Sequence, residues 1–159
     1  MALGDSKVKA VPAKVSEILH AYLDKPPFLL NFGYHSVIGK LNYLAQTTRP
    51  DIVCVTHQLA KYSSNPREPH GEAVLHLISY LKKTQDLGTC FKPDQGFECY
   101  FDADFSGNWN KHLAPFDPST AKLQSVWIVF YAGCLFIWAS KLQTQVALST
   151  TEAEYITMS

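Results

Sequence analysis

Residues 124–139, QSVWIVFYAGCLFIWA, decide the fold of the second half of the chain: two apolar runs separated by a single glycine, Gly133. Both runs are rich in β-branched and aromatic residues, which pack well on a pleated sheet. A glycine between two such runs suits a tight turn. The stretch therefore predicts a β-hairpin in the middle of a sheet. Its run at residues 126–132 is the longest apolar run of the chain and is far too short to span a membrane.

A further strand is predicted before the hairpin, at residues 97–103. It follows a turn of Pro, Asp, Gln and Gly at residues 93–96, which a shorter strand-like run, residues 89–92, precedes. Cys99 alternates with phenylalanines in this strand, which predicts a buried free thiol. Residues 104–120 have the composition of a loop. The sheet is therefore expected to have three main strands.

Helices are predicted on both sides of these strands. Residues 149–154, STTEAE, open a helix with a capping-box pattern. This helix has barely completed two turns when the sequence stops at Ser159, so we expect the chain to be a piece of a longer one. Near the other end, residues 16–23 favour a short helix that two prolines stop.

Between these ends, three helices are predicted by apolar stripes at helical spacing. Breaks at residues 47–50 and 63–66 separate them, the third covers about residues 70–83, and Asp51 suits the first turn of the second. Such stripes are mostly core faces, so they predict packing rather than a function. The stripes are Val37, Leu41 and Leu44 in the first helix, Ile52, Val55, Leu59 and Tyr62 in the second, and Val74, Leu77, Ile78 and Leu81 in the third.

The composition of the 159 residues is that of an ordinary globular protein, with 47% hydrophobic residues and a formal net charge of zero. Residues 1–95 are slightly basic and residues 96–159 slightly acidic. Neither charge excess is large enough to make a strong phosphate-binding surface. The four cysteines have no paired spacing, and the first ten residues contain no apolar signal core. These features predict a reduced protein inside the cell, cytoplasmic or nuclear.

Three segments resemble copia-type retrotransposon polyproteins, in the same order and with the same spacing. They are residues 34–44, YHSVIGKLNYL, with TRPDI at residues 48–52; residues 100–105, YFDADF; and residues 146–155, VALSTTEAEY. The resemblance implies a helical reverse-transcriptase tail at residues 34–86 and part of a ribonuclease H domain at residues 87–159. Residues 1–33 match only loosely and form a poorly defined N-terminal segment.

The resemblance also implies a chemistry, the hydrolysis of RNA in RNA–DNA hybrids with two Mg²⁺ ions held by four carboxylates. Asp102 resembles the first of these carboxylates, at the end of a strand, and Glu154 the second, in the first turn of a helix. The other two lie downstream of that helix in the family, beyond Ser159. We therefore expect little or no cleavage by this chain, and no polymerase activity, since the polymerase aspartates would precede Met1.

Each acidic residue also has a plainer interpretation. Asp102 could be a solvated acid at the end of a strand, and Asp104 a turn residue. Glu154 follows Thr151 by three residues, the spacing at which a glutamate reaches back to cap a helix, and Glu152 stands in the same relation to Ser149.

Two other site hypotheses are weaker. Cys54 and His57 have the spacing of a zinc-binding pair on a helix, with His70 or His76 as partners, but nothing nearby resembles a second chelating pair. The hydroxyls of residues 149–151 invite a nucleophile hypothesis, although helix capping explains them better.

The expected fold is α+β or α/β: a helical subdomain followed by a partial, truncated ribonuclease H-like mixed sheet. The expected function is that of an inactive polyprotein fragment related to ribonuclease H, whose ancestral partner is an RNA–DNA hybrid. The alternative is a domesticated, non-enzymatic interaction module that uses an open sheet edge. Its partners would be the rest of the polyprotein or a second copy of the chain.

Overall fold

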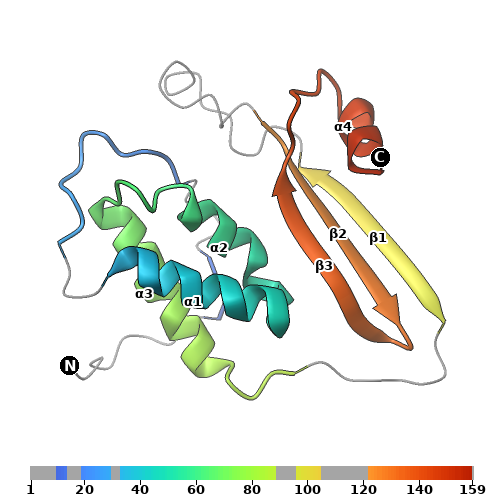
Figure 1. The fold of residues 1–159 in the computed structure, drawn as a ribbon, viewed down its shortest axis with the longest axis horizontal. Helices are drawn as coiled ribbons and strands as arrows, with labels where there is room; N and C mark the ends of the chain where they lie inside the picture. The colour runs from blue at the N-terminus through green and yellow to red at the C-terminus, as the bar shows by residue number, and fades with distance from the viewer. Residues whose placement is uncertain (1–9, 14–18, 30–32, 89–95, 105–121, 159) are drawn as a thin grey trace. The chain divides into compact units, whose positions relative to one another are not determined.

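The computed structural model describes residues 10–13, 19–29, 33–88, 96–104 and 122–158. The chain divides into two compact units, Met1–Gly88 and Thr89–Ser159. The first unit holds helices and the second an antiparallel sheet with one helix (Figure 1). The predicted fold class is thereby confirmed as α+β with a partial sheet. None of the described helices is long and apolar enough to cross a membrane.

Helix α1, Tyr34–Thr47, is rotated relative to the predicted stripe. Leu41 is buried as expected, but Leu44 is exposed, and the inward face is instead completed by Tyr34, Ile38 and Ala45. The cause is a tertiary contact, because the buried Tyr34 hydroxyl donates to the Leu59 carbonyl at 3.0 Å. Burial raises the pKa of Tyr34 well above its ordinary value, which keeps this hydroxyl a donor.

The next helices follow their stripes more closely. A short 3₁₀ turn, Pro50–Ile52, leads into α2, Val53–Ala60, and a loop then leads to α3, Glu68–Lys83. The predicted burial of Ile52, Val55, Leu59, Val74 and Leu77 is confirmed. Tyr80 takes the last inward position of α3, while Ile78 and Leu81 are half-buried.

The described N-terminal residues 19–29 run alongside α2 and α3 without forming the predicted helix, so that prediction is wrong for residues 19–23. Prolines prevent a continuous helix and leave backbone groups that bond to α3 and the loop before it. The Phe28 N–H donates to the Pro66 carbonyl at 3.0 Å, and the Glu68 N–H to the Pro26 carbonyl at 3.3 Å.

His70 joins this N-terminal segment to the helices. It is fully buried, and its ring stacks on Tyr62 with 4.2 Å between centroids. Its Nδ1 accepts the Arg67 N–H at 2.9 Å, so Nε2 carries the proton and donates to the His20 carbonyl at 2.8 Å. Burial lowers the pKa of His70, which favours this neutral form. Both ring nitrogens are therefore occupied by backbone, and His70 is no zinc ligand here.

The sheet has three described strands in the order β1-β2-β3: β1, Phe97–Asp104; β2, Gln124–Tyr131; and β3, Cys134–Leu142. The predicted hairpin is confirmed, with β2 central and β3 at an edge. Its turn consists of Ala132 and Gly133, whose φ angles of 51° and 66° match a hairpin turn with two left-handed residues. The strand predicted at residues 89–92 and nearly all of the predicted loop at residues 104–120 lie outside the described residues.

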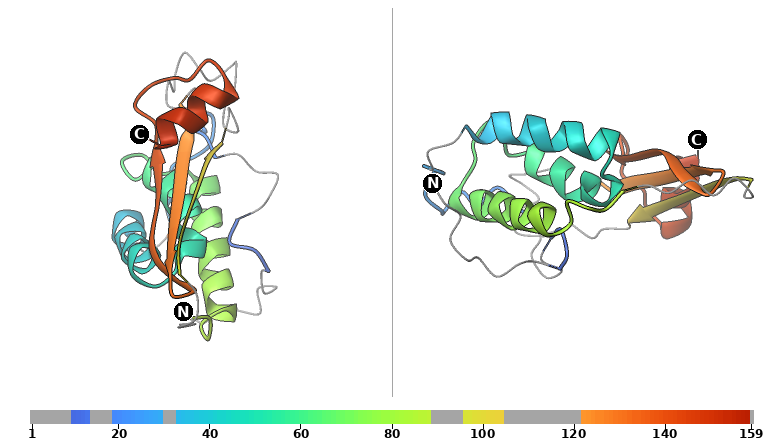
Figure 2. Two further views of the ribbon diagram at one scale, coloured as in Figure 1. Left: turned by 90° about the vertical axis from the view of Figure 1, so that its right-hand side faces the viewer. Right: turned by 90° about the horizontal axis from the view of Figure 1, so that it is seen from below.

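Cys99 corrects another prediction, because its thiol is free but exposed. Alternation placed it correctly on one face of β1 with Phe97 and Phe101, yet these phenylalanines are 69% and 47% exposed. Burial of a strand face requires a layer packed over it. Helix α4, Thr150–Met158, lies only across the end of the sheet where β1 stops and β2 starts (Figure 2).

Candidate functional site

Asp102 lies near the end of β1, with Val126 of β2 opposite it. Its side chain is exposed, and Oδ1 accepts the N–H of Ala103 at 2.9 Å. Because side chains alternate along a strand, Asp102 belongs to the same face as Glu98 and Tyr100.

Glu154 lies on α4 directly after Ala153, the fully buried residue of this helix. Its own side chain is exposed. The capping interpretation of Glu154 is wrong, because α4 begins one residue before Thr151. Ser149 is the cap instead: its Oγ accepts the Glu152 N–H at 3.1 Å, and Glu152 Oε2 accepts the Leu148 N–H at 2.7 Å.

A buried polar network, which the sequence did not reveal, fixes α4 on the sheet. Gln143, just after β3, is 5% exposed and donates through Nε2 to the Ala153 carbonyl at 3.1 Å and to Ser125 Oγ at 2.9 Å. The Ser125 and Thr157 hydroxyls lie 2.7 Å apart. Ala153 packs beside Leu123 and Ala147, and these small and apolar side chains hold α4 close to the strands. The only signal in the sequence is a polar residue at either end of an apolar hairpin.

Helix α4, which carries Glu154, packs on one face of β1, and Asp102 belongs to the other face. Ala103 packs against the apolar cluster around Ala153, and Phe101 lines a hollow with Ile156 and Thr157 of α4. The alternate residues, including Asp102, therefore project from the face that α4 does not cover. Asp102 and Glu154 lie in the same unit.

A metal centre is not formed by the described part of the chain. No group of three or more His, Cys, Asp or Glu side chains that could hold an ion occurs among these residues. Mg²⁺ requires near-octahedral oxygen coordination and keeps its waters unless several anionic ligands converge. Asp102 and Glu154 by themselves therefore do not fit a two-magnesium site. Among the candidate zinc residues, His76 Nε2 contacts the Val11 carbonyl at 2.9 Å.

Comparison with known proteins places these features in a family, although no protein-family model and no solved structure matches the chain. A retrovirus-related Pol polyprotein from the tobacco transposon TNT 1-94 is 37% identical over 124 residues, 77% of this chain and 9% of the relative. The corresponding polyprotein of the Arabidopsis thaliana transposon RE2 is 32% identical over 77% of this chain and 8% of the relative.

A third relative has a different name, secreted RxLR effector protein 161 of Plasmopara viticola. It is 32% identical over 131 residues, 81% of this chain and 86% of the relative. The chain thus spans less than a tenth of the transposon polyproteins that it matches and most of the effector. The chain belongs to the family of copia-type retrotransposon Pol polyproteins, of which it matches one segment.

Proposed function

We propose that the second unit is the first part of a ribonuclease H-like domain, and that Asp102 and Glu154 occupy two carboxylate positions of a hybrid-cleaving centre which they do not complete. The similarity to Pol polyproteins supports this origin. The position of Asp102 near the end of β1, and of Glu154 on the helix after the hairpin, follows the order that the motifs imply. The substrate of the centre is an RNA–DNA hybrid.

We further propose that residues 1–159 alone do not cleave such a hybrid. The observation that carries this proposal is the absence of any third ligating side chain beside Asp102 or Glu154 among the described residues. Incubation of the chain with a hybrid labelled on its RNA strand, in Mg²⁺ or Mn²⁺, should give no more product than the variant Asp102→Asn. Chelator-sensitive cleavage that disappears in Asp102→Asn would contradict it.

The inherited positions have a separate test. The chain can be joined to the part of the tobacco Pol polyprotein that follows the matched segment. We expect this longer chain to cleave the hybrid, and Asp102→Asn or Glu154→Gln to abolish cleavage without lowering the melting temperature. Glu152→Gln is the matched control, because Glu152 caps the helix and should leave cleavage intact.

The name of the Plasmopara viticola relative refers to secretion, whereas we propose a reducing, intracellular location for this chain. The thiols of Cys54 and Cys99 are exposed and form no disulfide, which suits a compartment that keeps thiols reduced. A tagged chain should stay in the cytoplasmic or nuclear fraction of cells, and its export would contradict the proposal.

A further inference from the structure

The outer edge of β1 presents backbone groups that no described strand uses. The Gly96 carbonyl accepts the Ala132 N–H at 3.2 Å, so it points toward β2. In an antiparallel pair, the inward and outward backbone groups alternate by residue. The N–H and C=O of Phe97, Cys99, Phe101 and Ala103 therefore point outward. The bond from the Ala103 N–H to its neighbour Asp102 agrees, since that N–H is not used by β2.

The two edges of the sheet differ in their protection against another strand. The pairing of β3 with β2 shifts register between Val129 and Phe130, which leaves Phe136 as an extra, bulged residue, and β3 also carries Lys141. Bulges, prolines and charged side chains, lysines especially, are the usual features that block edge pairing. The β1 sequence, FECYFDAD, has neither lysine nor proline, its register with β2 is unbroken, and its three acidic residues exclude some registers of pairing but not all. The edge open to a further strand is thus β1.

The charges of β1 select one register for a second copy of the same strand. Directly opposed residues of an antiparallel pair lie on the same face of the sheet. A two-fold axis perpendicular to the sheet therefore lies at one residue, which stands opposite the same residue of the second copy. An axis at Tyr100 opposes Glu98 to Asp102 and also needs the Ala103 N–H, which Asp102 already binds. An axis at Phe101 opposes Glu98 to Asp104. Like charges directly opposite each other destabilise a sheet.

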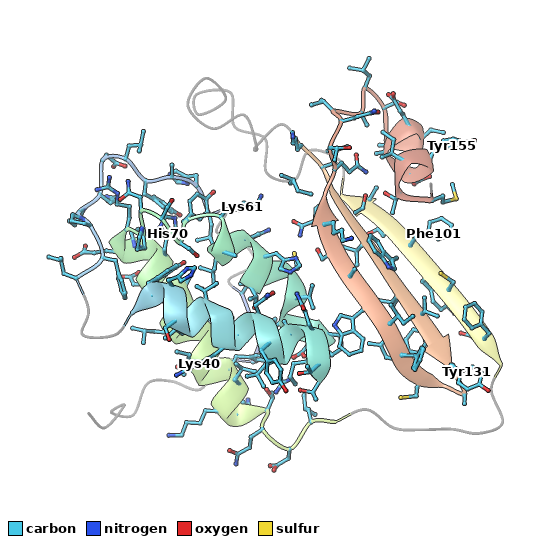
Figure 3. The ribbon with its side chains drawn as sticks, in the orientation of Figure 1. Lys40, Lys61, His70, Phe101, Tyr131 and Tyr155 are labelled. Atoms are coloured by element: carbon cyan, nitrogen blue, oxygen red, sulfur yellow. The ribbon has the colours of Figure 1, made fainter. Side chains whose placement is uncertain are left out.

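An axis at Cys99 avoids both conflicts. It opposes Phe97 to Phe101, an aromatic cross-strand pair, and Glu98 to Tyr100. The Tyr100 hydroxyl already donates to Glu98 of its own chain at 2.9 Å and can make the same bond across the axis. Figure 3 shows Phe101 on β1, which is an edge strand of the sheet.

We propose that two copies of this chain pair in antiparallel fashion through their β1 edges, about a two-fold axis at Cys99. The pairing joins two three-stranded sheets into one continuous sheet. It goes beyond the proposed function and does not depend on hybrid cleavage, since neither carboxylate need bind a metal.

The test is thiol cross-linking combined with analytical ultracentrifugation. The variant Cys54→Ser/Cys90→Ser keeps Cys99 as the exposed thiol among the described residues, and a short thiol-specific cross-linker should join it to Cys99 of a second copy. Moving the thiol, with Cys99→Ser and Tyr100→Cys, should reduce the cross-linked yield. A monomer at all concentrations, or a higher yield from the moved thiol, overturns the proposal.

Two exposed phenylalanines supply a matched pair of variants. Phe97→Lys, on β1, should weaken the dimer by roughly tenfold or more, because a charged edge residue opposes pairing. Phe136→Lys, on the bulge of β3, places the same charge on a residue of similar exposure, 64% against 69%, and should leave the dimer unchanged. If Phe136→Lys dissociates the dimer and Phe97→Lys does not, the interface is not β1. Tryptophan fluorescence verifies that both variants remain folded.

Discussion

The Arg49 guanidinium donates to both oxygens of Thr84, through Nη1 to the carbonyl at 2.9 Å and through Nη2 to Oγ1 at 2.6 Å. Its other side forms a two-bond ion pair with Asp51, at 3.0 and 2.8 Å. Thr84 caps the end of α3, so this one side chain fastens the loop after α1 to the far end of another helix. Its planar fork suits such a double contact, which a lysine cannot reproduce.

Replacement of Arg49 by methionine should destabilise the helical unit by about 3 kcal/mol, because it leaves the partly buried Asp51 carboxylate and the Thr84 carbonyl without their main partner. Arg49→Lys should recover only part of the loss. Urea unfolding followed by far-UV circular dichroism measures the change. Lys40→Met, on the exposed side of α1, is the control and should be nearly neutral. A similar loss in both methionine variants would mean that charge, not the network, sets the stability.

The stability of this unit should fall in acid through Asp51. Burial would raise the pKa of Asp51, but hydrogen bonds from Arg49 and Tyr80 outweigh burial and hold the pKa below its ordinary value of 3.8. A carboxylate with a lowered folded pKa contributes its full stability above its unfolded pKa and loses it as the pH falls through the folded pKa. The unfolding free energies of the wild type and Asp51→Asn should therefore converge below about pH 4. A constant difference down to about pH 3 would contradict this.

Two helical glycines should respond oppositely to alanine. A Cβ on Gly71 of α3 would overlap the ring of Phe28, so Phe28 must leave its place and Gly71→Ala should cost about 1–3 kcal/mol. A Cβ on Gly39 of α1 meets nothing within 4 Å, and Gly39→Ala should stabilise the unit by about 0.5–1 kcal/mol through helix propensity. Thermal melts of the two variants, side by side, distinguish packing from propensity. Destabilisation by Gly39→Ala would refute the comparison.

Local sequence patterns predicted the elements of this fold better than their surroundings. The spacing of apolar residues and the turn-forming glycine were sufficient to predict the hairpin at Gly133 and most of the buried positions of α2 and α3. The rotation of α1 depends on a bond between Tyr34 and Leu59, 25 residues apart, which no local pattern encodes. Likewise, alternation placed Cys99 on a strand face but could not tell whether anything covers that face.

The candidate site shows the same division. Motif order located Asp102 and Glu154 on a strand and a helix, whereas the network that seats this helix joins three distant segments through Gln143, Ser125 and Thr157. The capping residue was ambiguous because Ser149 and Thr151 each precede a glutamate by three positions. Only the observed start of the helix decides between them.

The two assignments of the cap predict different mutational effects in the second unit. Ser149→Ala removes the acceptor of the Glu152 N–H and should cost about 0.5–2 kcal/mol. Thr151→Ala lies within the helix and should be neutral or slightly stabilising, since alanine is the better helix former. Glu154→Gln should also be nearly silent, because Glu154 is exposed and makes no capping bond in the structure.

Tryptophan fluorescence reports on this unit alone, because Trp109, Trp127 and Trp138 all lie within it. Urea unfolding of the three variants should therefore rank Ser149→Ala as clearly the least stable. Glu152→Gln is the conservative control: a glutamine can still accept the Leu148 N–H, so most of the stability should remain. If Thr151→Ala were instead the destabilising change, α4 would start later than Thr150. Glu154 would then be its capping residue, and an inherited ligand role would have to compete with the cap.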